Sequence, residues 1–182
     1  MSFIPLGILA AAGGGAGGAF ESIATATPSG VSSVTFSSIP ATYTSLQVRF
    51  SVRTSGSGQP IYIRMNNVST STYRIHYLAG NGSSASAGAN QDTGWLTEYF
   101  NGCDPTNPFV AICDFHDYAS TTKNKVIRSF SGIDENGSGQ VWLSSGLLEN
   151  TSAINRLDFA ILGGGQTFAS GSTISLYGIK GA

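Results

Sequence analysis

Charge is the scarcest property of this chain. Only 10% of its 182 residues are charged, against about 25% in an ordinary soluble domain. Nine Lys and Arg residues and ten Asp and Glu residues leave a formal net charge of −1. This balance provides neither a basic surface for nucleic acid nor an acidic field for cationic substrates. Because free proteins usually rely on net charge for solubility, the composition favours a protein that is packed in an ordered array or a symmetric oligomer.

Cysteine and histidine are equally scarce, with two residues of each. No CxxC motif and no His pair at zinc-ligand spacing accompanies Cys103 and Cys113. We expect Cys113, in the apolar run 109–113, to be a small core residue, and a disulfide with Cys103 is the less favoured alternative. We also expect the cluster Asp114-Phe115-His116-Asp117 to be a strand end. A divalent-cation site there is the weaker alternative, because protein metal sites usually have three or more ligands.

Catalytic and nucleotide-binding motifs are missing as well. The glycines of 13–18 match GxGxxG literally, but the residues that follow resemble a strand, and no acid occurs between Glu21 and Asp92 to bind a ribose. There is no GxSxG, and the acidic residues lie mostly beside turn residues. We therefore expect a protein that is not an enzyme and that needs no cofactor and no metal.

Long hydrophobic runs are absent except at the N-terminus. The run 3–12 is about ten residues long and contains Pro5, whereas a membrane span needs about twenty apolar residues. It has no basic region before it, since the first Lys or Arg is Arg49. We expect neither a secretion signal nor a membrane span.

Residues 1–19 are instead expected to form an extended arm that docks on another protein. No charge precedes Glu21, and the segment 13–19 contains only Gly and Ala, so the arm has nothing with which to form a core of its own. The side chains expected to dock are the large apolar ones: Phe3, Ile4, Leu6, Ile8 and Leu9.

The rest of the chain, residues 20–182, has the period of β-strands. Apolar and polar residues alternate over 46–53, and the same alternation recurs at 61–65, 73–77 and 157–161. Shorter candidate strands are 20–27, 31–36, 95–100, 109–117, 125–130, 140–144 and 173–179. The best helical candidate, 146–150, is a single turn. Without helical crossovers the strands must be largely antiparallel, so we expect an all-β, two-sheet β-sandwich of the jelly-roll type.

Two further features bear on binding. Residues 80–94 show no periodicity and are expected to be a long loop, either a contact loop or a surface excursion. The aromatic residues Trp95, Tyr99, Phe100, Tyr118 and Trp142 are expected in the core and at interfaces, and the alternative is an exposed platform for stacking on sugars.

Trp142 lies in the strand 140–143, where Val141 and Leu143 must point the opposite way. Apolar residues on both faces indicate that this strand is covered on both sides, by the sandwich core on one and by a neighbouring subunit on the other. We therefore expect Trp142 to be buried, and we expect Trp142 and Leu143 to lie at an oligomer interface.

The two ends of the chain have distinctive sequences: the opening Met1-Ser2-Phe3-Ile4-Pro5-Leu6-Gly7-Ile8-Leu9 with its Gly/Ala run, and 168–180, which closes with Leu176-Tyr177-Gly178-Ile179-Lys180. Together they resemble small β-rich virion structural proteins of tailed phages, especially marine and cyanobacterial phages. The segments 80–84 and 117–125 are similar too, so the likeness spans most of the chain.

This resemblance implies a structural protein on the exterior of a phage particle, with no catalytic residues. The expected role is a capsid decoration or cement protein that docks on the major capsid protein, or on another virion protein, and assembles with itself, as a homotrimer if it follows other jelly rolls. The alternative is a tail-fibre or receptor-binding module that recognises a host polysaccharide.

Overall fold

A computed structural model describes residues 18–97, 103–163 and 165–181, and these contain strands but no helix. The strands are β1 (Phe20–Ala26), β2 (Ser33–Phe36), β3 (Ser45–Val52), β4 (Ile61–Met65), β5 (Tyr73–Gly80), β6 (Ala85–Asp92), β7 (Trp95–Leu96), β8 (Phe109–His116), β9 (Lys125–Asp134), β10 (Gly139–Leu148), β11 (Leu157–Ile161) and β12 (Thr173–Ile179). The strands expected from the sequence are all present, with ends that differ by a few residues.

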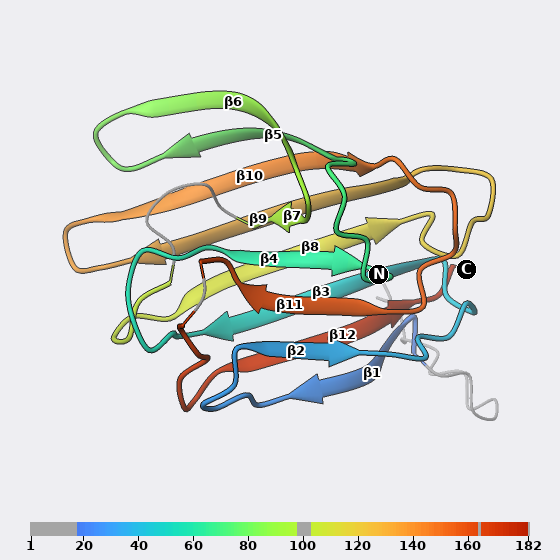
Figure 1. Cartoon of the computed structure of the whole chain (residues 1–182), viewed down its shortest axis with the longest axis horizontal. Helices are drawn as coiled ribbons and strands as arrows, with labels where there is room; N and C mark the ends of the chain where they lie inside the picture. The colour runs from blue at the N-terminus through green and yellow to red at the C-terminus, as the bar shows by residue number, and fades with distance from the viewer. Residues whose placement is uncertain (1–17, 98–102, 164, 182) are drawn as a thin grey trace, which may run out of the picture.

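The strands form two antiparallel sheets (Figure 1). The large sheet has eight strands in the order β1-β12-β3-β8-β9-β10-β5-β6, and the small sheet has four in the order β2-β11-β4-β7. The small sheet lies over one face of the large one. This confirms the all-β, antiparallel two-sheet sandwich, whereas the strand order does not confirm the jelly-roll topology.

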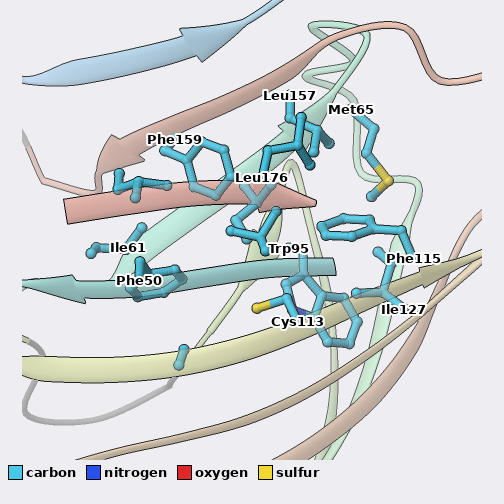
Figure 2. Close-up of a cluster of buried hydrophobic side chains, with 14 of the residues drawn as sticks. Phe50, Ile61, Met65, Trp95, Cys113, Phe115, Ile127, Leu157, Phe159 and Leu176 are labelled. Atoms are coloured by element: carbon cyan, nitrogen blue, oxygen red, sulfur yellow. The ribbon is translucent and has the colours of Figure 1, made fainter. Parts of the chain in front are cut away.

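The core lies between the two sheets (Figure 2) and follows directly from the alternation in the sequence. In β3 the residues Leu46, Val48, Phe50 and Val52 are buried, and the residues between them point the other way. Figure 2 shows the aromatic and aliphatic side chains that meet between the sheets, among them Phe50, Trp95, Phe115 and Phe159. The face of each sheet that carries these residues is thereby fixed as the inner face.

Both cysteines are buried and no disulfide joins them, as the favoured interpretation of the sequence predicts. Cys113 lies on the inner face of β8, opposite Val48 of β3. Burial raises the pKa of the Cys113 thiol far above its usual range, so this thiol stays protonated and unreactive.

Two local expectations are wrong. The segment 80–94 is a β-hairpin instead of a long loop: β6 pairs with β5 over its whole length, and Asn81 Oδ1 closes the turn by accepting hydrogen bonds from the Ser83 and Ser84 amides. The side chains of β6 show no apolar and polar alternation, so the sequence does not reveal this strand. Backbone pairing with β5 holds it in place at the edge of the sheet. The segment 146–150 is not a helical turn either, since β10 continues to Leu148.

Gly146 is required where β10 passes under Trp95. A β-carbon on Gly146 would lie 2.0 Å from Trp95 Cζ3 and 2.1 Å from the Arg74 carbonyl oxygen, and the latter belongs to rigid backbone. We predict that Gly146→Ala lowers the free energy of unfolding by about 3 kcal/mol, because overpacked cores lose roughly that much. The matched control is Gly80→Ala on the adjacent strand, where the nearest atom is Val141 Cγ1 at 3.8 Å. Equal melting temperatures for the two variants in thermal denaturation would contradict this packing.

Tyr73 holds the turn that follows β4 through its buried hydroxyl. It accepts a hydrogen bond from the Met65 amide at 2.9 Å and donates one to the Val68 carbonyl at 3.2 Å. Burial raises the pKa of Tyr73 to about 12. The folded state therefore keeps a proton that the unfolded chain releases near pH 10, and the resulting stabilisation is complete below pH 10 and is lost as the pH rises toward 12.

We predict that Tyr73→Phe costs about 1–2 kcal/mol at neutral pH, because the Met65 amide loses its partner. Between pH 10 and 12 the wild-type chain should lose stability faster than the variant. Urea denaturation at a series of pH values measures both effects. Parallel pH profiles would show that the hydroxyl is solvated.

Candidate interaction surface

The outer face of the large sheet is the most unusual surface of the molecule. Strand alternation sends every second side chain of β8, β9, β10 and β5 away from the core. The small sheet covers the opposite, inner face, and no strand of the described residues lies over the outer one. A sheet face that is exposed to water is normally polar, so its composition indicates what it meets.

Four large apolar side chains form a row across this outer face. The pairing register places Ile112 beside Phe130, Phe130 beside Leu143, and Leu143 beside Leu78. Their exposed fractions are 42%, 57%, 56% and 55% in the order Ile112, Phe130, Leu143 and Leu78. We call these four residues the central row.

A second row lies two residues further along the strands. Here Val110 is beside Gly132, Gly132 beside Val141, and Val141 beside Gly80. The two valines are 49% and 45% exposed. Large and small residues alternate along this second row, so it has two protrusions and two gaps.

The gap over Gly132 opens into a shallow hollow of about 500 Å³. Valine, isoleucine and phenylalanine side chains of the two rows line part of it together with Gly132, and polar residues of β3 and β12 line the rest. Its outward-facing lining residues are Arg49, Ser51, Val110, Ile112, Phe130, Gly132, Val141, Thr173 and Ser175. The hollow is thus apolar and open, with the shape of a contact surface and without the convergent titratable groups of an active site.

Polar residues lie on the other side of the central row. The polar row consists of Asp114, Arg128, Ser145 and His76, which are neighbours in that order across the same four strands. Gln47 Nε2 of β3 donates a hydrogen bond to Asp114 Oδ1 at 2.7 Å. The apolar residues therefore form a band with the polar row along one of its borders.

The alternation predicted around Trp142 is confirmed. Trp142 is 2% exposed, its ring lies 4.8 Å from that of Tyr77, and its Nε1 donates to Gln140 Oε1 at 3.0 Å. Val141 and Leu143 point outward. Of the two residues expected at an interface, Leu143 is therefore the one whose side chain is presented to a neighbour, while Trp142 supports the strand from within. That Leu143 contacts another subunit stays a prediction.

The other expected docking residues, Phe3, Ile4, Leu6, Ile8 and Leu9, lie outside the described residues. The chain enters the described structure at the edge of the large sheet, where β1 pairs with β12. The Lys180 amide donates to the Ala19 carbonyl at 2.9 Å. The first described residues, Gly18 and Ala19, therefore lie beside the C-terminal end of the described chain.

Residues 114–117 lie at a strand end, as expected. Asp114 and His116 point outward from β8, and Asp117 lies in the following turn with φ of 53°, where it accepts a hydrogen bond from Lys123 Nζ at 3.1 Å. Within the described residues, no three His, Cys, Asp or Glu side chains come together as a set of metal ligands.

The aromatic residues do not form the alternative sugar-stacking platform. Trp95 and Tyr118 are fully buried, as is Trp142, because they lie on inner faces or beneath loops. The Tyr118 hydroxyl donates to the Pro40 carbonyl and accepts from the Tyr43 amide, so it is used inside the protein. Tyr99 and Phe100 lie outside the described residues. The platform expectation is thus wrong for three of its five members.

The outward position of Phe130 and Leu78 was not predicted from the sequence. Phe130 shares the outer face of β9 with Arg128, and Leu78 shares the outer face of β5 with His76. Each apolar side chain therefore lies on the same face as a polar one. In β9 the odd-numbered residues from Lys125 to Ile133 are buried, and this alternation would have placed Phe130 on the outer face. For Val110 and Ile112 the signal was the unbroken apolar run 109–113, which indicates a strand with two apolar faces.

Comparison of the chain with protein-family models, with curated proteins and with solved structures finds no match. Across the part of the chain that the structure describes, no helix has the length and apolar character needed to cross a membrane.

We predict that Phe130→Ser leaves the fold of the isolated chain intact. The side chain already lies in water, so dilute protein should lose less than about 0.5 kcal/mol of unfolding free energy. Binding of a fluorescent hydrophobic dye should fall, because the central row is interrupted. Phe115→Ser on the inner face of the adjacent strand is the control and should cost more than about 3 kcal/mol. A comparable loss of stability in both variants would show that Phe130 is packed.

Proposed function

We propose that this protein is a structural component of a phage virion, namely a decoration or cement protein on the particle exterior. In this proposal the arm, residues 1–19, docks on the major capsid protein or another virion protein, and the β-sandwich domain, residues 20–182, associates with its own copies. The observation that carries the proposal is the apolar band on the outer face of the large sheet, in a chain with a net charge of −1.

The apolar band supports a role in assembly because its exposure is costly for a free protein. Six side chains, those of the central row with Val110 and Val141, are 42–57% exposed. Covering them would contribute roughly 1 kcal/mol each before the entropic cost of association is subtracted. Contiguous apolar surface of this kind marks sites of interaction with other proteins.

The low charge and the arm support the same role. A shell protein gains stability by burying apolar surface between subunits, and it does not need a charged surface of its own to stay dispersed. The arm carries five large apolar side chains and no charge, and it joins the sandwich at one edge of the large sheet. In this proposal the arm and the outer face serve two different contacts.

The receptor-binding alternative has lost its main support. It depended on exposed aromatic residues and on a long contact loop, and the structure has three of those aromatic residues buried and a β-hairpin in place of the loop. We therefore propose the decoration role alone.

Deletion of residues 1–19 should separate docking from folding. The truncated chain should still unfold cooperatively, because the described core contains no residue of the arm, but it should no longer join particles that lack the protein. Circular dichroism melting and co-sedimentation with such particles measure the two effects, and the full chain is the control. A truncated chain that still binds particles would contradict docking through the arm. A copy number far below that of the capsid subunits would contradict the decoration role.

A further inference from the structure

The residues on the outer face of the large sheet are arranged so that the face is complementary to itself under a twofold rotation. We infer that it pairs face to face with the same face of a second copy of this chain, around a twofold axis that runs parallel to the strands between β9 and β10. The inference concerns the sandwich domain only and does not depend on where the protein is located.

The central row is complementary to itself under this symmetry. A twofold axis between β9 and β10 places β9 against β10 of the second copy, and β8 against β5. Phe130 then lies against Leu143 of the second copy, and Ile112 against Leu78. All four large side chains of the row are covered in this arrangement, as an isologous interface requires.

The rows on either side fix the direction of the axis. An axis parallel to the strands keeps each row opposite itself, so the apolar second row meets the second row and the polar row meets the polar row. An axis across the strands would instead place Val110 against Asp114 and Gly132 against Arg128, which leaves charged groups buried within the apolar band. The first arrangement is therefore favoured.

The second row then fits by shape. Val141 lies over the gap at Gly132 of the second copy, and Val110 lies over the gap at Gly80. Each of the two valines thus enters a gap in the other copy. Because of the symmetry, the two valines of the second copy enter the gaps of the first in the same way. Such interdigitation is how the facing residues of two packed sheets fill the space between them, about 10 Å deep.

The polar row also pairs favourably. Asp114 faces His76 of the second copy, so that an imidazole can donate to a carboxylate, and Arg128 faces Ser145. Within this row no acid is set against an acid and no arginine against an arginine. The arrangement therefore adds polar contacts at the border of the apolar band, where interfaces normally carry them.

The available surface is large enough. Six strands, from β3 to β6 in sheet order, span roughly 29 Å at about 4.8 Å per strand, and strands of eight residues run for roughly 27 Å. A face of that size is comparable with the ~800 Å² that each partner contributes to a stable interface. The twofold pairing gives a dimer, whereas the expectation from the sequence was a homotrimer. The two assemblies differ in molecular mass.

Light scattering of the full chain over a range of concentrations tests the pairing. A dimer, with twice the 18.8 kDa of one chain, is expected. Leu143→Asp should weaken the dimer at least tenfold while the chain stays folded, because this side chain lies in water in the single copy. The matched control is Val31→Asp, which changes a 46% exposed valine in the turn region between β1 and β2 and should leave the dimer intact.

A monomer at every concentration, a trimer, or an unchanged dimer in Leu143→Asp would each overturn the inference. None of these results bears on particle docking through the arm, which is measured separately with the truncated chain.

A residue exchange tests the axis. Gly80→Val fills the gap over which Val110 of the second copy lies, and it should weaken the dimer; the space around Gly80 in its own chain is ordinary, so the fold should be kept. Adding Val110→Ala should restore much of the lost affinity, because the enlarged residue then meets a smaller one. Loss of affinity in the double variant equal to the sum of the single losses would show that the two positions do not face each other, and would overturn the proposed axis.

Discussion

The structure depends on one constraint, which is that a β-sheet has two faces and the described residues, 18–97, 103–163 and 165–181, place a second sheet over only one of them. Eight strands pair into the large sheet, whereas the small sheet has four strands and lies on the inner face. Burial between the sheets stabilises the fold through Phe50, Trp95, Phe115 and Phe159. The outer face of β8, β9, β10 and β5 then carries large apolar side chains that no described strand covers. Both the stability of the domain and the proposed assembly follow from this asymmetry.

Much of the fold could be predicted from the sequence, because strict alternation leaves little choice of face. In β3 and β11 every second residue is apolar, and these strands lie where the pattern indicates. The pattern failed where side chains do not determine the strand. The hairpin strand β6 consists of small and polar residues, and only its backbone pairing with β5 reveals it. At Gly146 the leucines that follow suggested a helical turn, whereas the close approach of Trp95 holds this part of the chain in β10.

The candidate surface could be predicted only in part. Val141 and Leu143 flank a buried tryptophan, so their exposure follows from local sequence alone. The composition of the rows does not follow from local sequence, because Leu78, Ile112, Phe130 and Leu143 come from four different strands, of which β5 is distant in the sequence from the consecutive strands β8, β9 and β10. The pairing register brings them together, and a shift by one residue would send each to the other face. The same register sets Gly132 beside Val141, an arrangement that no local pattern indicates.

The central claim is that the outer face is covered by protein in the assembled state. The most direct test is the rate at which a thiol reagent labels Ser145→Cys as the protein concentration is raised, because this exposed residue lies two positions from Leu143 on the same face of β10 and its substitution leaves the central row intact. The native thiols of Cys103 and Cys113 are buried, so the new thiol reports alone. The account predicts rapid labelling of dilute protein and a rate that falls as the protein becomes concentrated. A labelling rate that is the same at every concentration would contradict it.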